Sequence, residues 1–482
     1  MSGAAPSTTP DTAPASWREL LHPDLAARTV TIVLGVWLNA ADSLITATIL
    51  PSVGQSLGGY QYFGWAVAAY LFGCIVAGAS SGQLAERIGL ARATSIAALV
   101  YAVGCAMSAL APDAPVFMAG RLVQGVGAGW IAGFCYVAIS VVFPERMWAR
   151  MFSILAGAWG LATVVGPLMG GLFAQSGFWQ GAFWTFAIQG VAFAIAAWFL
   201  LRGGHSANAD RRPFAARTLG LLAAAIGLIA AADVAGGKLA PALLLAAGLA
   251  ALLLAARVNV LPRERLAPAA IGHPATSAGA GYAMIFLMAV AAAAFGVYGA
   301  ALLQSLYGLS PLAAGYVVST EAVGWTGAAF LVSHQPPARH PVLVRAGAAT
   351  ITAGVALLAL SFHLGSPWYV ALAGTVLGTG FGLSWSLATQ RLLQALSDDE
   401  RATGASSVPT MQMIGGAVGA AAAGALANLL GLSHHFSVAR AAEAGPWLFA
   451  AFIPLGVLGC FAAARLMRGD VPPPLHGKGQ PA

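Results

Sequence analysis

Charged side chains are scarce in this chain of 482 residues: only 8% are Asp, Glu, Lys or Arg, while 59% are hydrophobic. Soluble globular proteins carry about 25% charged residues, so the composition excludes a soluble domain of any size. The mean hydropathy is +0.79. The apolar runs have the length of spanning helices and lack the alternation of barrel strands. The sequence therefore predicts an all-α integral membrane protein.

Signatures of metal, nucleotide and redox chemistry are also missing. The four cysteines lie in apolar runs without metal-ligand or disulfide spacing, so we interpret them as small packing residues: Cys74, Cys105, Cys135 and Cys460. No HExxH sequence, phosphate-binding loop or dinucleotide fingerprint occurs in a suitable context. We therefore expect no metal, no cofactor and no ATP-driven pumping. The net charge of +7 forms no basic patch, so we also expect no nucleic-acid partner.

One enzyme motif has to be weighed. GASSG at 78–82 satisfies the Gly-x-Ser-x-Gly pattern of a serine nucleophile, which needs a strained turn and a nearby histidine and acid. Here the motif closes an apolar run rich in Gly and Ala. An intramembrane serine hydrolase is therefore a remote alternative, and we predict a protein that is not an enzyme.

Apolar runs of about 20 residues, bounded by Pro, Gly or charge, predict fourteen transmembrane helices. If the amino terminus is cytoplasmic, all of the 23 Lys and Arg except Lys238, Arg440 and Arg121 fall on the cytoplasmic side, as the positive-inside rule requires. We therefore expect a multi-pass protein of the inner membrane with both termini in the cytoplasm. The expected spans are 29–53, 61–82, 93–112, 115–141, 151–175, 180–201, 214–233, 239–257, 279–304, 311–333, 343–363, 367–391, 402–430 and 446–466.

Spans seven and eight form a hairpin of little more than Ala, Leu and Gly. Six spans lie on each side of it, and a faint repeat pairs 149–174 with 402–427, for example through Ser153 and Ser406. Two repeated bundles with a site between them are typical of secondary transporters. We expect a disordered cytoplasmic tail, a six-helix bundle, a linker with the inserted hairpin, a second six-helix bundle and a cytoplasmic tail, over 1–28, 29–202, 203–265, 266–468 and 469–482.

Two stretches carry a family resemblance. GQLAERIGLAR, after span two, resembles the signature loop Gly-x-Leu-Ala-Asp-Arg-x-Gly-Arg-Lys of the major facilitator superfamily, with Glu in place of the usual Asp. RLVQGVGAG, in span four, resembles that family's Arg-x-x-Gln-Gly pattern. The resemblance implies two six-helix bundles and a gating charge network in this loop, at Gly82, Glu86, Arg87, Gly89 and Arg92.

Three more stretches narrow the resemblance to the fourteen-span drug/proton antiporters. ADSLITATILPSV and QSLYGLSPLAAG are similar to patterns of that family, and GPLMGG resembles the Gly-Pro-x-x-Gly-Gly element of exporters. Proline kinks a helix and glycines let neighbouring helices approach, which suits a helix that bends between two access states. A static packing kink is the alternative for these residues, which are Gly166, Pro167, Gly170 and Gly171.

Two acids lie near the middle of their spans, Asp42 in the first and Glu321 in the tenth. A charged acid at mid-bilayer costs about 2.5–3.5 kcal/mol on insertion scales, so such acids usually carry function. A carboxyl group holds its proton where it is desolvated and releases it where water reaches it. We predict that Asp42 or Glu321 exchanges a proton for a substrate cation, with a structural hydrogen bond between helices as the alternative.

Arg121 is also unusual, because a guanidinium is rarely placed within a span. The resemblance implies that Arg121 tunes a proton site across helices, and snorkelling to the outer surface is the alternative. Aromatic faces can bind cations, although tryptophans in membrane helices more often anchor or pack. The candidate substrate contacts are Trp37, Gln124, Trp159, Trp325 and Trp385.

The predicted function is proton-coupled export of hydrophobic or cationic drug-like compounds by alternating access. The interior carries little fixed positive charge, which favours a small-molecule substrate that is amphiphilic and neutral or cationic. We expect a monomer whose partners are the lipid bilayer, protons and this substrate. A siderophore or metabolite exporter, or a proton-coupled importer of the same fold, is the alternative.

Overall fold

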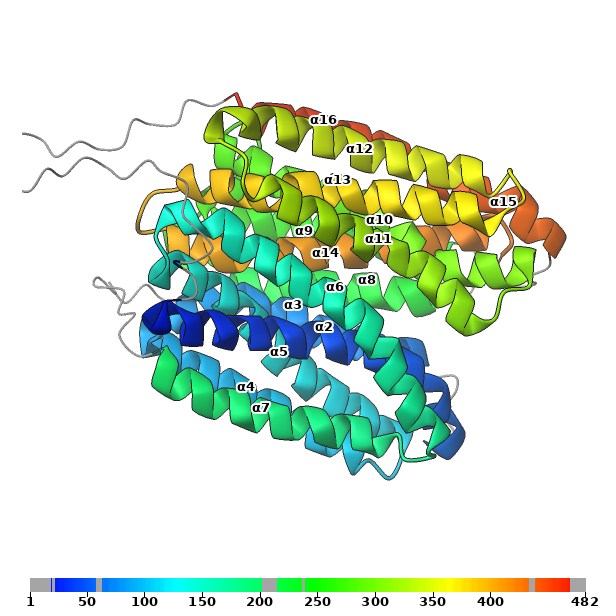
Figure 1. Ribbon diagram of the computed structural model, residues 1–482, viewed down its shortest axis with the longest axis horizontal. Helices are drawn as coiled ribbons and strands as arrows, with labels where there is room; N and C mark the ends of the chain where they lie inside the picture. The colour runs from blue at the N-terminus through cyan, green and yellow to red at the C-terminus, as the bar shows by residue number, and fades with distance from the viewer. Residues whose placement is uncertain are drawn as a thin grey trace, which may run out of the picture.

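The computed structural model describes residues 19, 22–57, 63–201, 215–235, 239–432 and 438–468. Its long helices run in roughly one direction, and both described ends of the chain lie at the same end of the molecule, here termed the termini face (Figure 1). The predicted tails 1–28 and 469–482 lie mostly outside the described residues. The first boundary was wrong, however, because the opening helix begins at Pro23, and proline suits a first helical position.

All regular structure that the described residues form is helical. The short 3-10 helices are η2 (Pro262–Glu264), η3 (Ala269–Gly272) and η4 (Pro337–Arg339). The α-helices are α2 (Pro23–Leu57), α3 (Phe63–Ile88), α4 (Leu90–Ala109), α5 (Ala114–Val142), α6 (Glu145–Gln175), α7 (Gln180–Leu200), α8 (Ala216–Val234), α9 (Ala240–Asn259), α10 (Ser277–Tyr307), α11 (Pro311–Val332), α12 (His340–Ser361), α13 (Pro367–Gln394), α14 (Arg401–Leu429), α15 (Val438–Ala450) and α16 (Ile453–Leu466).

Side chains at the ends of the helices explain several boundaries. The Asp113 carboxylate accepts a hydrogen bond from the Val116 N–H at 2.9 Å and caps the start of α5. The Ser310 hydroxyl caps α11 in the same way, since short polar side chains satisfy the free N–H groups of a first turn. Gly308 ends α10 with a φ of 63°, a conformation that glycine adopts at little cost.

Twelve helices in the described part of the chain are long and apolar enough to cross a membrane. Two predicted spans fall outside this set: α8, whose apolar part covers Ala216–Ala232, and α11. The chain is therefore a multi-pass, all-helical membrane protein. The count of fourteen spans stays a prediction.

The helices pack in two groups. Helices α2–α7 contact mainly one another, and so do α10–α16. The groups meet where α14 packs on α3 and α5, and where α6 packs on α11 and α13. Helices α8 and α9 pair with each other, and α8 also contacts α3 and α14 (Figure 1). Helices α6 and α14, which contain the two copies of the faint repeat, therefore each pack against the other group of helices.

The predicted loop after span two is mostly helical. Helix α3 continues through Gly82, Glu86 and Arg87, because the sequence QLAERI contains no helix breaker. Only Gly89 separates α3 from α4, and Arg92 lies in the first turn of α4. Gly89 has a φ of 83°, where a residue with a Cβ would be strained. The expectation of a loop between residues 82 and 93 was therefore wrong, and the motif is a helix end followed by a one-residue break.

Candidate functional site

A cavity of about 350 Å³ lies where the two groups of helices meet. Helices α2, α5 and α6 line it from one group, and α11, α13 and α14 line it from the other. Its size falls in the range of small-molecule sites, which are about 300–1,000 Å³. The lining is mostly apolar, with polar groups from Asn39, Tyr136, Thr163, Ser319, Glu321, Thr326 and Gln412.

Glu321 is the one acid among the described residues that line this cavity. Its position on α11 is fixed by close packing, because the Glu321 carbonyl lies against Gly378 of α13, where any Cβ would clash. Within the described part of the chain, its carboxyl group forms no hydrogen bond or ion pair. An unpaired carboxylate is costly in apolar surroundings. The group is therefore suited to bind either a proton or a cation from the cavity.

Three tryptophans surround the cavity. Trp325 stacks on Phe381 with ring centroids 4.6 Å apart and lies 5.7 Å from the ring of Trp385. Trp159 lines the cavity from the opposite group of helices. Trp37 is not part of the lining, and it packs against the core instead. The cavity thus combines aromatic faces with one carboxyl group, a combination that binds organic cations.

Asp42 lies outside the cavity lining and is fully buried, with an exposed fraction of 0%. Its Oδ1 lies 3.3 Å from Nη1 of Arg121 and accepts hydrogen bonds from Nε2 of Gln124 at 2.9 Å and from Thr46 Oγ1 at 3.1 Å. Arg121 also donates to Oε1 of Gln124 at 2.8 Å. The Tyr70 ring covers the guanidinium, with 4.2 Å between Cζ and the ring centroid. These five residues, termed the buried network, compensate each other's charge and polarity.

The buried network corrects two expectations. The Arg121 side chain is 3% exposed, so it does not snorkel to the outer surface, because its counterion lies on α2. Gln124 belongs to the network and does not line the cavity. One contact connects the two sites: Asn39 lines the cavity and accepts a hydrogen bond from the Tyr70 hydroxyl at 3.5 Å.

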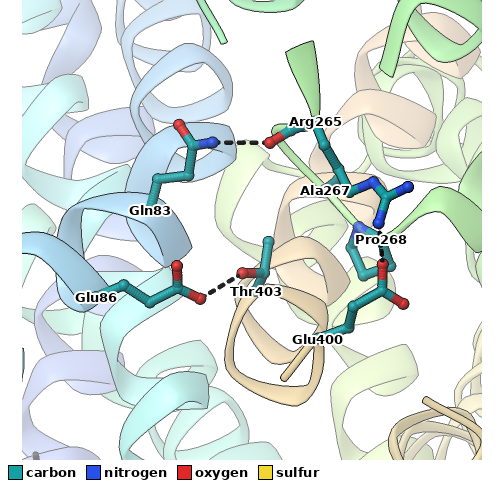
Figure 2. A pocket seen from close by; sticks show the side chains of 7 residues that line it. All are labelled: Gln83, Glu86, Arg265, Ala267, Pro268, Glu400 and Thr403. Atoms are coloured by element: carbon teal, nitrogen blue, oxygen red, sulfur yellow. Dashed lines mark hydrogen bonds and ion pairs between the residues drawn. The ribbon is translucent and has the colours of Figure 1, made fainter. Parts of the chain in front are cut away.

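Polar contacts join the two groups of helices at the termini face. The Glu86 carboxylate accepts a hydrogen bond of 2.9 Å from the hydroxyl of Thr403, in the first turn of α14 (Figure 2). A carboxylate is favourable beside the N-terminus of a helix. Glu145 of α6 pairs with Arg401 at 2.7 Å, and its backbone carbonyl accepts a hydrogen bond from Gln390 at 3.2 Å. These contacts hold the two groups together at this face.

The close approach of α3 and α14 depends on Gly82. A Cβ at Gly82 would lie 2.8 Å from the Cα of Thr403, which is too close for any side chain. Arg87 and Arg92, the basic residues of the motif, are exposed at this face. The structure thus assigns Gly82 and Glu86 to the contact with the other group of helices.

Helices α6 and α11 are joined closer to the cavity. The Ser153 hydroxyl donates a hydrogen bond to the Ala329 carbonyl at 3.1 Å, and the Thr326 hydroxyl donates one to the Ala156 carbonyl at 3.2 Å. Hydroxyl groups often bridge helices in this way within membranes. Together with the contacts at the termini face, these bonds hold the two groups of helices together on that side of the cavity.

The glycines of the exporter-like motif differ in their surroundings. A Cβ at Gly166 would lie 2.7 Å from the Cβ of Leu44 on α2, and one at Gly170 would meet the same helix. A Cβ at Gly171 would meet nothing within 4 Å. Pro167 lies within α6, between the first two glycines. The motif therefore packs α6 on the part of α2 that follows Asp42.

The Gly-x-Ser-x-Gly motif lies inside α3. The Ser80 hydroxyl is buried, donates to the Ala77 carbonyl at 2.8 Å and accepts a hydrogen bond from the Trp130 indole at 2.9 Å. A serine nucleophile needs an exposed hydroxyl on a strained turn. Ser80 is therefore a helix-packing residue.

The residues that sequence reasoning missed are partners of residues that it found. Thr46 lies one helical turn after Asp42, so helical spacing could have identified it. Tyr70 and Thr403 lie on other helices than their partners, and a single sequence contains no signal that pairs them with those partners.

Comparisons with known proteins agree with this architecture. The model of the Major Facilitator Superfamily matches residues 32–420. A probable multidrug-efflux transporter of Mycobacterium tuberculosis is 31% identical over 472 residues, which cover 94% of this chain and 97% of that protein. Azole resistance protein 1 of Saccharomyces cerevisiae is 29% identical over 176 residues, 36% of this chain and 29% of that protein.

Two solved structures share the fold. A proton:xylose symporter has a TM-score of 0.65 at 16% identity, and the match covers 90% of this chain and 94% of that one. The human organic anion transporter MFSD10 has a TM-score of 0.64 at 14% identity over 92% of this chain and 100% of that one. The chain therefore belongs to the Major Facilitator Superfamily, and it is a membrane transporter and not an enzyme.

Proposed function

We propose that this transporter exports hydrophobic or cationic drug-like compounds by alternating access, driven by proton influx. The observation that carries the proposal is the unpaired Glu321 carboxyl in an aromatic cavity between the two groups of helices. The similarity to a protein named a probable multidrug-efflux transporter, over nearly the full length of both chains, supports the direction of transport.

The exchange is possible because the proton and the cationic substrate compete for one carboxyl group, that of Glu321. A cationic substrate between the tryptophan faces binds best when Glu321 is ionised, whereas a proton on Glu321 removes that attraction. Protonation from outside would therefore release the cation, and deprotonation on the inside would allow the next cation to bind. At Glu321 one proton enters for each monovalent cation that leaves, so the exchange moves no net charge and the pH gradient, not the membrane potential, drives it.

We propose that Asp42 is a second, indirect proton site. Protonation of Asp42 would remove the charge that holds Arg121, and a buried guanidinium without its counterion is unstable. The contact between α2 and α5 would then be weakened, because Asp42 lies on α2 and Arg121 on α5. Arg121 would thus tune Asp42 across helices, as the resemblance implies, while the link from Asn39 to Tyr70 connects this change to the cavity.

We propose the following arrangement in the membrane. Fourteen helices span it, with α8 and α11 completing the twelve that are apolar enough on their own. Residues 23–202 and 266–468 form the two bundles, and 203–265 contain the inserted hairpin. The termini face is cytoplasmic, because an inside location of both ends places most Lys and Arg on that side, and the protein acts as a monomer in the inner membrane.

Uptake of a fluorescent lipophilic cation into inverted membrane vesicles, energised by a pH gradient, tests the function. We expect the wild type to accumulate the cation only while the gradient is present. Glu321→Gln should abolish this accumulation, and Glu321→Asp should retain part of it because the charge is kept. Accumulation by Glu321→Gln at the wild-type rate would contradict the proposal.

A narrow-specificity transporter of a polar metabolite, acting as exporter or as proton-coupled importer, is the second candidate. The amide side chain of Gln412 in the cavity lining favours it, because this amide can form hydrogen bonds that a lipophilic cation does not need. A correctly inserted wild type that ignores lipophilic cations and transports a polar solute would support this candidate.

A further inference from the structure

The segment that follows the α8–α9 hairpin is held in place by its own hydrogen bonds. We term this segment, residues 260–276, the connector. Asn259, at the end of α9, is 3% exposed, and its Oδ1 accepts hydrogen bonds from the N–H groups of Leu266 and Ala267 at 2.8 and 2.9 Å. Its Nδ2 donates to the Ala267 carbonyl at 2.9 Å. A single buried amide therefore fixes the connector to α9.

The connector is also fixed to the first helix of the hairpin. The carbonyl of Glu264 accepts a hydrogen bond of 2.7 Å from the Thr218 hydroxyl, and the Glu264 carboxylate accepts one of 3.1 Å from the Arg217 N–H. The connector is thus tied to both α8 and α9. Hydrogen bonds therefore join it to both helices of the hairpin.

Arg265 of the connector contacts both groups of helices (Figure 2). Its backbone carbonyl accepts a hydrogen bond of 2.7 Å from Nε2 of Gln83, which lies on α3 beside Gly82. Its Nη1 lies 3.1 Å from Oε1 of Glu400, the residue before α14. The side chains of Arg265 and Glu400 are 26% and 16% exposed, so water and salt screen this pair less than an open surface pair.

These contacts lie beside the direct link between the two groups. In Figure 2 the Glu86 to Thr403 hydrogen bond runs next to the path from Gln83 through Arg265 to Glu400. Both paths join α3 to α14, and α8 of the hairpin packs on the same two helices. Any movement that separates α3 from α14 at the termini face must therefore break a contact of Arg265 as well as the direct link.

We propose that Arg265 is a gating residue, and that through it the hairpin is a working part of the gate at the termini face. The inference rests on the alternating-access part of the proposed function. Arg265 acts as a positioning residue: it does not touch the substrate, and it sets how readily α3 and α14 separate. The hairpin then contributes to the closed state through its connector, in addition to the contacts that the two bundles make directly.

Cavity accessibility from the termini face tests this proposal. The protein would carry Ala322→Cys in the cavity lining, with its four native cysteines replaced, in vesicles that expose the termini face as shown by a C-terminal tag. Labelling by a membrane-impermeant maleimide then reports opening. We expect Arg265→Ala to raise the labelling rate about tenfold, which corresponds to about 1.4 kcal/mol, and Arg265→Lys to stay within about twofold of the parent because it keeps the charge.

The same connector offers a matched control. Arg263 is exposed and has the same charge, so Arg263→Ala should leave the labelling rate unchanged. The charge exchange Arg265→Glu with Glu400→Arg should restore slow labelling, which a general loss of structure would not allow. If Arg265→Ala does not fold, Glu400→Gln tests the same contact from α14.

An unchanged rate in Arg265→Ala or Glu400→Gln, or an equal rise in Arg263→Ala, would overturn the inference. The labelling needs neither substrate nor a proton gradient. Its outcome is therefore independent of whether the substrate is a drug-like cation, and failure of the export assay would not mimic failure of the gate.

Discussion

Asp42 and Glu321 are acids at similar depth in apolar helices, one in each group, and their surroundings are opposite. Asp42 is sealed among Arg121, Gln124 and Thr46, away from the cavity. Glu321 faces the cavity without a partner in the described part of the chain. The comparison separates two tasks that a transporter must perform. Asp42 lies in a contact between two helices, whereas Glu321 lies where a ligand in the cavity can reach it.

The largest expected difference between the two acids is in stability. Asp42→Asn leaves Arg121 buried without its counterion, and breaking a buried ion pair costs about 3–5 kcal/mol. Glu321→Gln removes an unpaired charge and should not lower stability. Thermal unfolding of the purified proteins in detergent would measure both. As a control, the double variant Asp42→Asn with Arg121→Gln should regain part of the lost melting temperature. Equal melting temperatures for Asp42→Asn and Glu321→Gln would contradict the difference between the two acids.

The second difference is in cation transport. A full charge about 4 Å from a carboxylate gains about 4 kcal/mol at an effective dielectric constant of 20, and about 1.4 kcal/mol already changes affinity tenfold. Glu321→Gln should therefore weaken binding of a lipophilic cation at least about tenfold, with little effect on a neutral amphiphile. Fluorescence titration of the purified protein with both ligands would show this. Equal losses for the two ligands would mean that Glu321 only shapes the cavity.

The packing of α6 on the helix of Asp42 can be tested with two glycines of one motif. Gly166→Ala places a Cβ against Leu44, and overpacking of this kind costs about 1–3 kcal/mol. Gly171→Ala, in open space, should change stability by less than about 0.5 kcal/mol. Melting temperatures and vesicle transport should both fall for the first variant only. Equal melting temperatures and equal transport rates for the two variants would mean that the packing of α6 on α2 does not affect the buried network.

The smallest expected effect concerns the aromatic lining. Trp159 lines the cavity and Trp37 does not, and a cation–π contact is worth about 0.5–1 kcal/mol when exposed. Trp159→Ala should therefore weaken cation binding by about twofold to fivefold, whereas Trp37→Ala should leave it unchanged. The same titration measures both variants. A larger loss of cation affinity in Trp37→Ala than in Trp159→Ala would indicate that the cation binds outside the described cavity.

Much of the architecture can be predicted from the sequence, because apolar length and charge determine which segments span a bilayer. The environment of a side chain cannot be predicted in this way. Asp42 and Glu321 lie at similar depth in their spans, yet only contacts with other helices decide that one meets Arg121 and the other the cavity. Trp159 lines the cavity and Trp37 does not, and this difference also depends on which face of each helix meets which neighbouring helix.

The contacts of the helical motif after span two could not be predicted from the sequence either. Its residue types and spacing indicate the family, but Gln83, inside the motif, gains its role only through Arg265, 182 residues away. The partner lies in a connector whose own order depends on Asn259. A single sequence does not contain that pairing.

Proton release on substrate binding shows directly whether a proton and a cation compete for Glu321. Tetraphenylphosphonium would be added to the purified protein in a weakly buffered detergent solution, at a pH where part of the protein is protonated, while a pH-sensitive dye reports released protons. We expect release of up to about one proton per bound cation from the wild type, since both compete for one carboxyl group, and none from Glu321→Gln. Equal release from Glu321→Gln would contradict the exchange of a proton for a cation at this residue.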